Sequence, residues 1–273
     1  MNLTLDKTIS WDVEERPIYN ANGKQIKGFK ELVNNEKGNC ISITKSSYIP
    51  TKNEKLMELA DSFTKDTCFK IGGYATYNNG SKVMAYLENE EPRNFGGLQT
   101  KDYLIIGNSH DTTTALFTGM CNQIYRCSNM FGSRHRQNTI RHSRNQESKI
   151  KGISRTTRGY FKHLENVYEN AEKMSLVKVC GKDSDRLICN LLEIESITDK
   201  GLSTRSKNII REIESSIQRE SEELGGNLFG LFNGITHYTT HKLSNKNVFG
   251  SMLNTAYNYN QKAYHWCLNR MEN

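Results

Sequence analysis

The sequence concentrates positive side chains between residues 126 and 145, which read RCSNMFGSRHRQNTIRHSRN. This stretch contains five arginines and two histidines, and no carboxylate interrupts it. Planar guanidinium groups bind phosphate oxygens through paired hydrogen bonds, so an arginine-rich segment suits a phosphate-bearing ligand. The cationic residues are Arg126, Arg134, His135, Arg136, Arg141, His142 and Arg144.

The positive surplus of the chain lies in this region. The formal net charge of the 273 residues is +7. Residues 126–158 hold nine of the 37 Lys and Arg residues but one of the 30 acidic residues, Glu147, which leaves 28 basic and 29 acidic residues elsewhere. Focused positive charge attracts polyanions, and nucleic acid is the commonest of them. The alternative is a solvated basic face without a ligand.

Aromatic residues accompany the basic ones. Single-strand grooves combine arginines for the phosphates with aromatic rings for base stacking. The sequence contains no recognition helix, zinc finger or leucine zipper, which favours single-stranded or sequence-tolerant binding over reading of the major groove. Some of the rings could instead belong to the core. The predicted nucleic-acid contacts are Arg126, Arg134, Arg136, Arg141, His142, Arg144, Lys149, Lys151, Arg155 and Arg158, with the rings of Tyr125 and Phe131.

Two histidine patterns could bind metal or transfer protons. His110 and Asp111 are adjacent at the end of a predicted strand, although a turn-forming Asp beside a surface His is the favoured interpretation. The segment HYTTH, residues 237–241, spaces two histidines by one helical turn. It lacks the glutamate of the zinc proteases, which favours polar histidines on a helix face. Phosphate-binding loops, dinucleotide fingerprints and G-x-S-x-G are absent from the sequence, so neither an enzyme class nor a cofactor is predicted.

The elements that must position these residues change type near the middle of the chain. Asn22-Gly23 and Asn79-Gly80 predict two hairpins, and a capping box from Thr51 to Glu54 predicts a helix. Residues 123–131 could form a short helix. From residue 148 onward apolar residues recur with helical spacing. The expected fold is α+β: a β-rich part with one helix over residues 1–147, then a helical part over residues 148–273, packed together as one compact unit.

Composition narrows the cellular setting. No apolar run approaches the roughly 18–20 residues of a membrane span, and the N-terminal segment lacks the pattern of a secretory signal. Seven irregularly spaced cysteines without a C-x-x-C pair disfavour a disulfide framework or a zinc knuckle. These features predict a cytoplasmic protein without a membrane partner.

Three segments together resemble a known family. KDYLIIGNSHDTTTALFTG is similar to a strand–SHDG–strand element, IYRCSNMF with NTIRHS to a second element, and NLFGLFNGITHYTTH to a late helix. Thr112 stands where the family element usually has Gly, and Gly234 where it usually has Ala. These elements are typical of the phage- and plasmid-like proteins grouped as the domain of unknown function DUF932. The resemblance extends from about Lys24 to Trp266. Its motif positions are Ser109, His110, Asp111, Arg126, Cys127, Asn129, Arg141, His142, Asn233, Thr236, Tyr238 and His241.

The resemblance implies a role in phage or plasmid DNA metabolism, and a hairpin-rich core followed by helices is similar to the single-strand annealing recombinases. We therefore expect an ATP-independent protein that binds single-stranded nucleic acid, with annealing as a further expectation and a ring or filament of copies as the assembly. One alternative is a non-enzymatic phage protein that binds a host factor through its basic face. The other is a metal-dependent nuclease that uses His110, Asp111 and a histidine of the basic segment.

Overall fold

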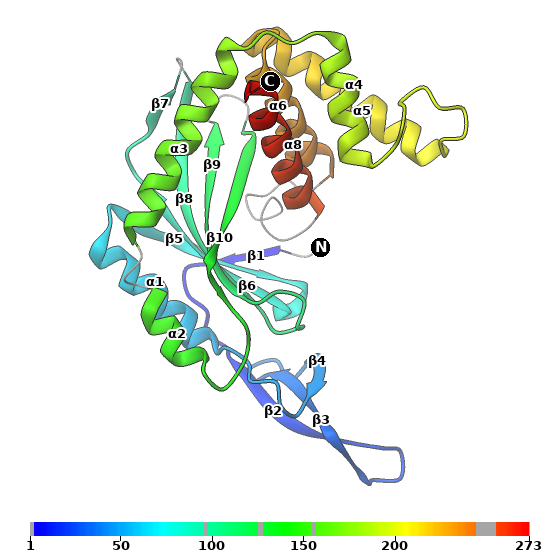
Figure 1. Cartoon of the computed structure of the whole chain (residues 1–273). Coiled ribbons are helices and arrows are strands. Elements are labelled where there is room, and N and C mark those ends of the chain that lie inside the picture. Colours follow the sequence, from blue (N-terminus) through cyan, green and yellow to red (C-terminus); the bar gives the residue numbers. More distant parts are fainter. Residues whose placement is uncertain (1–2, 96–97, 125–127, 154–156, 244–254, 273) are drawn as a thin grey trace. The chain divides into compact units, whose positions relative to one another are not determined.

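The computed structural model in Figure 1 describes residues 3–95, 98–124, 128–153, 157–243 and 255–272. The chain divides into two compact units that are not consecutive halves. Unit 1 comprises Met1–Glu91, Asp102–Met120 and Arg134–Tyr160, and unit 2 comprises Pro92–Lys101, Cys121–Ser133 and Phe161–Asn273. Three long strands, β8 (Leu98–Ser109), β9 (Leu116–Ile124) and β10 (Met130–Ile140), contribute residues to both units. The boundary predicted after residue 147 therefore falls inside unit 1.

The β-rich first half and the helical second half confirm the expected α+β class. Seven strands of the described residues form one sheet in the order β1-β5-β6-β8-β9-β10, with β7 paired to β8. The pairs β1–β5, β5–β6 and β6–β8 are antiparallel. The strands of this sheet are β1 (Leu3–Asp6), β5 (Phe69–Tyr77), β6 (Lys82–Asn89), β7 (Arg93–Phe95), β8 (Leu98–Ser109), β9 (Leu116–Ile124) and β10 (Met130–Ile140).

The hairpin predicted at Asn79-Gly80 is confirmed. Strands β5 and β6 pair from Tyr77 opposite Lys82, and a 3-10 turn, η1 (Asn78–Gly80), joins them. Asn79 and Gly80 adopt φ angles of 55° and 94°, which Asn and Gly tolerate better than other residues. A Cβ atom on Gly80 would lie 2.6 Å from the ring of Trp11. Gly80 is therefore needed both for the turn and for the close approach of Trp11.

Helix α1 (Asn53–Asp66) buries the predicted apolar stripe of Leu56, Leu59, Ala60 and Phe63 in unit 1. The predicted capping box is wrong, because the N-cap residue is Lys52 and no side chain caps it. The Thr51 hydroxyl, assigned to the cap, instead donates a hydrogen bond to Gln146 Oε1 at 2.9 Å. An Asp12 oxygen accepts the backbone N–H of Asn53 at 3.0 Å and satisfies the first turn from outside the helix.

A second, three-stranded sheet in unit 1 has the order β2-β3-β4, with β2 (Val13–Tyr19), β3 (Gln25–Asn34) and β4 (Cys40–Lys45). Its β2–β3 hairpin turns at Gly23, as predicted, with φ +73°. Strand β4 pairs with β3 only from Phe29 to Val33. Beyond Phe29 the sheet continues as a two-stranded extension, visible in blue in Figure 1.

The turn between β8 and β9 contains a strained residue. Thr112 has φ +63°, a left-handed conformation that disfavours β-branched side chains. Thr112 therefore costs conformational energy at this turn. Asp111 holds the turn by accepting hydrogen bonds from the backbone N–H and the hydroxyl of Thr113.

Unit 2 is built largely of helices, in agreement with the apolar periodicity beyond residue 148. The short helix predicted over residues 123–131 is wrong. Residues 123 and 124 end β9, and residues 130 and 131 begin β10. The backbone carbonyl of Asn129 accepts the backbone N–H of Ile124 across the turn.

In the described residues no helix has the length and apolarity needed to cross a bilayer. In the described part of the chain, the helices after β10 are α2 (Gln146–Ile153), α3 (Thr157–Leu176), α4 (Gly181–Leu192), α5 (Thr204–Leu224), α6 (Leu228–His237), the π-helix η2 (Tyr238–Leu243) and α8 (Thr255–Glu272).

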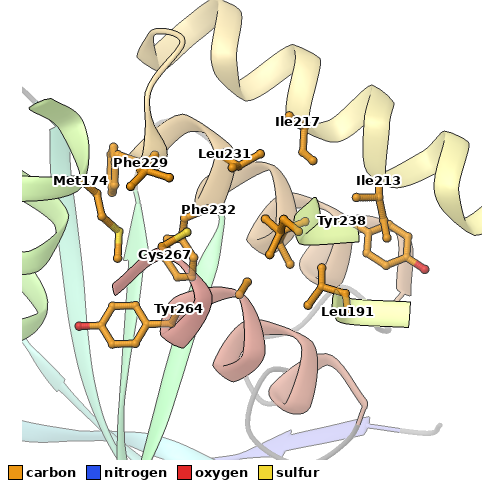
Figure 2. Close-up of a cluster of buried hydrophobic side chains, with 14 of the residues drawn as sticks. Met174, Leu191, Ile213, Ile217, Phe229, Leu231, Phe232, Tyr238, Tyr264 and Cys267 are labelled. Atoms are coloured by element: carbon orange, nitrogen blue, oxygen red, sulfur yellow. The ribbon is translucent and has the colours of Figure 1, made fainter. Parts of the chain in front are cut away.

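The core of unit 2 surrounds helix α6, whose ten residues are all buried. Figure 2 shows side chains of α4, α5 and α8 converging on it, among them Leu191, Ile213 and Tyr264. Two glycines let α5 and α6 approach closely. A Cβ atom on Gly234 would lie 2.5 Å from Ile217 Cα, and one on Gly230 would lie 2.5 Å from the Gly225 oxygen. The backbones therefore pack at distances that a larger residue would prevent.

We expect Gly234→Ala to lower the free energy of unfolding by about 1–3 kcal/mol, because overpacking forces backbone shifts. At this chain size the melting temperature should fall by roughly 2–9 °C. Gly181→Ala is the matched control, because a Cβ atom there meets nothing within 4 Å. Thermal unfolding followed by circular dichroism measures both variants, and equal melting temperatures would contradict the packing argument.

Candidate functional site

The basic residues of this segment whose side chains the structure describes lie on the surface of unit 1. Arg141 and Arg144 follow strand β10, and Lys149 and Lys151 lie on helix α2; all four are exposed. Gln146 and Ile153 are the buried residues of α2. Their spacing turns the inner face of the helix toward the core and leaves the lysines outside. Among the described residues, Arg141, Arg144 and Lys149 have no ion-pair partner.

Several predicted contacts cannot be placed. Tyr125, Arg126 and Arg155 lie outside the described residues. Arg134 and Arg136 belong to β10 and Arg158 to the first turn of α3, but their side chains also lie outside the described part. Of the predicted set, Arg141, Arg144, Lys149 and Lys151 are thus the exposed cations that the structure places in unit 1, after β10 and on α2.

Two predicted contacts are corrected. Phe131 is 7% exposed and packs against Phe232 and Tyr264, with ring centroids 5.2 and 4.9 Å away. Its ring belongs to the core of unit 2 and is not available to stack on a base. His142 is half-buried, and its Nδ1 lies 3.1 Å from the Thr51 hydroxyl. Burial lowers its pKa, so His142 is a member of a polar network in unit 1 and not a cationic phosphate contact.

The centre of that network is His110, which was expected at the surface but is fully buried. Asn53 Nδ2 donates to the Trp11 carbonyl at 3.1 Å, which directs Asn53 Oδ1 toward His110 Nε2 at 2.9 Å. Nε2 must therefore carry the ring proton. Burial is the main cause that lowers the pKa of His110 to about 3, so the ring is neutral at physiological pH.

The backbone around His110 is tied to other elements of unit 1. Its N–H donates to the Ser81 carbonyl at 2.7 Å, and its carbonyl accepts the Ser42 hydroxyl at 2.6 Å. Nδ1 of His110 and Oδ1 of Asn108 have no hydrogen-bond partner in the described part of the chain. These contacts join the end of β8 to β4, to the β5–β6 turn and to the start of α1, which is a structural role.

His142 and Gln146 extend the network. Gln146 Nε2 lies 3.4 and 3.3 Å from the carbonyls of Ile49 and Pro50, which leaves its Oε1 to accept the Thr51 hydroxyl. His142 Nδ1 lies 3.1 Å from the Thr51 oxygen, and His142 Nε2 lies 3.4 Å from the Thr114 carbonyl. His142, a residue of the second motif, thus contacts Thr51, two residues before α1. A nuclease centre would need further ligands, but the described residues contain no group of three or more His, Cys, Asp or Glu side chains that could hold a metal ion.

The third motif lies in the core of unit 2. Asn233, Thr236 and Tyr238 are buried, and His237 is only 6% exposed, so the prediction of polar histidines on a helix face is wrong for His237. Its Nδ1 lies 3.1 Å from the Ser216 hydroxyl, and burial is the first cause that lowers its pKa to about 4. The helix widens into a π-turn after His237. His241 lies beside His237, with ring centroids 4.7 Å apart.

A cavity of about 50 Å³ in unit 2 joins the second and third motifs. Asn129, Asn233 and Thr236 line it together with the rings of Phe131, Phe232 and Tyr264. Asn129 is 1% exposed, and neither its Oδ1 nor its Nδ2 has a hydrogen-bond partner in the described residues. A buried unpaired amide costs free energy. Sequence reasoning placed Asn129 in a motif, but only the cavity shows its polar atoms to be unpaired.

A match to a protein-family model shows to which family the chain belongs. The model described as Domain of unknown function (DUF932) matches residues 41–262, well over half of the chain. The chain belongs to the DUF932 family. The matched region of this DUF932 protein includes the network around His110, apart from Trp11, and the residues that line the cavity of unit 2, apart from Tyr264. It begins after strands β2 and β3. No curated protein and no solved structure matches the chain significantly.

We expect stability to fall as the pH decreases below about 6.5. His110 and His237 have lowered pKa values in the folded protein. The unfolded chain therefore binds more protons between its own pKa of about 6.5 and the folded values, and acid favours unfolding. Urea unfolding at pH 7.5, 6 and 5 measures this dependence.

His110→Gln should reduce the dependence of the unfolding free energy on pH, because it removes one such group. If the unfolding free energy changed equally with pH in wild type and in His110→Gln, His110 would not be held neutral by burial.

We expect Asn129→Leu to raise the unfolding midpoint, since it removes an unpaired buried amide and the cavity can accept the methyl groups; the expected gain is about 1–2 kcal/mol. Asn260→Leu is the matched control. The Asn260 amide is fully buried, accepts the Thr239 hydroxyl at 2.7 Å and donates to the Met130 carbonyl at 3.2 Å. It should lose stability. A similar loss in both variants would show that the Asn129 amide is hydrogen-bonded in solution.

Proposed function

We propose that this DUF932 protein binds single-stranded nucleic acid through the exposed cations that follow β10 and lie on α2. One observation carries the proposal: Arg141, Arg144 and Lys149 are exposed and have no ion-pair partner in the described residues. Three adjacent unpaired cations repel one another. A polyanion relieves this repulsion and releases its own counterions when it binds.

The single carboxylate of the basic segment does not neutralise these cations. Glu147 lines a groove of unit 1 with Lys52 and Lys55, and its charge contributes to the raised pKa of Lys55, whose main cause is a hydrogen bond to Glu58. Glu147 therefore faces helix α1. Arg141, Arg144 and Lys149 are exposed and lack an ion-pair partner in the described residues, so their charge is available for phosphates.

Binding, and not catalysis, is the proposed activity. His110, the strongest candidate for proton transfer, is fully buried and hydrogen-bonded to Asn53, so a substrate cannot reach it. Annealing of complementary strands is the next step of the proposal. It requires several copies of the chain that hold two strands side by side, which is why we also propose a homo-oligomer.

The test is fluorescence anisotropy with a labelled 30-nucleotide oligo-dT at 50–200 mM salt. The variant Arg141→Glu/Arg144→Glu/Lys149→Glu should bind at least about tenfold more weakly. Its salt slope should be smaller by roughly 2, because each lost single-strand phosphate contact removes about 0.7. An oligo-U ligand of equal length compares RNA with DNA.

The matched control is Arg186→Glu/Arg205→Glu/Lys207→Glu, which makes the same change in net charge with exposed residues of α4 and α5. It should retain most of the affinity. Equal losses in the two triple variants, or wild-type binding that is undetectable at 50 mM salt, would refute the proposed interface. Mixing of labelled complementary strands with the wild-type protein tests annealing, and mass measurement by light scattering tests assembly.

A further inference from the structure

The β2–β3–β4 sheet, hereafter the ribbon, exposes apolar side chains to an extent that the rest of the described chain does not. Six large hydrophobic residues of the described part are exposed, and four of them lie on the ribbon: Tyr19 at 57%, Ile26 at 41%, Phe29 at 46% and Ile43 at 63%. Scattered exposed apolar residues are ordinary, but their concentration on one small element indicates a binding surface.

The strand register places two of these residues beside a cation. Phe29 pairs with Lys45, and Glu31 pairs with Ile43. Paired residues share a face of the sheet, as do residues two apart along a strand. Phe29, Glu31, Ile43 and Lys45 therefore lie on one face, on which Lys45 is directly opposite Phe29. An exposed ring flanked by a lysine is suited to a ligand that is flat and anionic.

Positive charge dominates the far end of the ribbon. Residues 16–30 contain Arg16, Lys24, Lys27 and Lys30 but no acidic residue. Arg16 pairs with Glu14 at 2.8 Å and Lys30 with Glu15 at 2.5 Å. Lys24 and Lys27 are exposed, and neither has an ion-pair partner among the described residues. The two-stranded end of the ribbon, which extends past β4 in Figure 1, thus retains unneutralised charge.

We propose that the ribbon is a second contact surface for the single-stranded nucleic acid, with Phe29 and Tyr19 stacking on bases and Lys24, Lys27 and Lys45 contacting phosphates. The inference rests on the proposed function, since both surfaces belong to unit 1 and bind the same polymer. Rings interleaved with cations are the combination that holds single strands without sequence preference. The family match begins at residue 41, so it includes most of β4 but neither β2 nor β3.

The experiment compares two ligands of equal charge, a 30-nucleotide oligo-dT and an abasic 30-mer. Tyr19→Ala/Phe29→Ala should weaken oligo-dT binding by about tenfold per ring, or ~1.4 kcal/mol each, and leave abasic binding unchanged. Lys24→Glu/Lys27→Glu should weaken both ligands. Leu176→Ala, at an 83% exposed residue of α3 in unit 2, is the control for loss of an exposed apolar side chain. Because all these residues are exposed, thermal unfolding should confirm intact folding.

Each outcome separates this inference from the proposed function. Wild-type affinity in the ring variant, with weak binding in the Arg141, Arg144 and Lys149 triple variant, overturns the ribbon and supports the first surface. The reverse pattern supports the ribbon and overturns the first surface. Equal losses for oligo-dT and the abasic strand in the ring variant overturn base stacking. A change in oligomer mass with unchanged oligo-dT affinity also overturns the inference and shows that the ribbon holds another protein chain.

Discussion

The hydrogen bond from His110 Nε2 to Asn53 Oδ1 is the contact on which unit 1 depends. It links the end of β8 to the first residue of α1, and it is shielded from water by its burial. A neutral histidine can donate this bond without the cost of burying a charge, and burial itself keeps the ring neutral. The bond also explains why the SHD segment does not act as a surface acid–base pair. His110 points into unit 1, and Asp111 serves the turn that follows.

Positive charge in unit 1 is arranged differently from the polar network. The network side chains form hydrogen bonds within unit 1, apart from His110 Nδ1 and Asn108 Oδ1, which have none in the described residues. Arg141, Arg144 and Lys149 instead stay exposed and lack ion-pair partners in the described residues. The ribbon repeats this feature with Lys24 and Lys27. Unpaired cations add little to folding stability, since surface ion pairs themselves contribute at most about 1 kcal/mol. For these cations, which lie on two surfaces of one unit, we propose a shared anionic ligand.

Unit 2 shows how much of a motif is structural. Asn233 and Thr236 hydrogen-bond within α6, and Gly234 permits the close packing of α5. Asn129 differs, because its amide lies at a cavity without a partner in the described part of the chain. Its neighbour Met130 is bonded on both sides, to Thr240 and to Asn260. The backbone at this turn is thus fixed by contacts with residues more than a hundred positions later in the chain.

Local sequence determined the elements of this protein well. The two hairpins, the apolar stripe of α1 and the α+β class follow from turn residues and from periodicity, both of which act over a few residues. The capping box at Thr51 and the helix over residues 123–131 were wrong, because Thr51 bonds to Gln146 and because strand pairing outweighs helical propensity near Asn129. The concentration of charge between residues 126 and 158 is likewise a property of the sequence by itself.

Only the tertiary structure decided which side chains are accessible. It buried His110, Phe131 and His237, and it left Tyr19, Phe29 and Arg141 exposed. Burial depends on residues distant in the chain that pack together, and no local pattern contains that information.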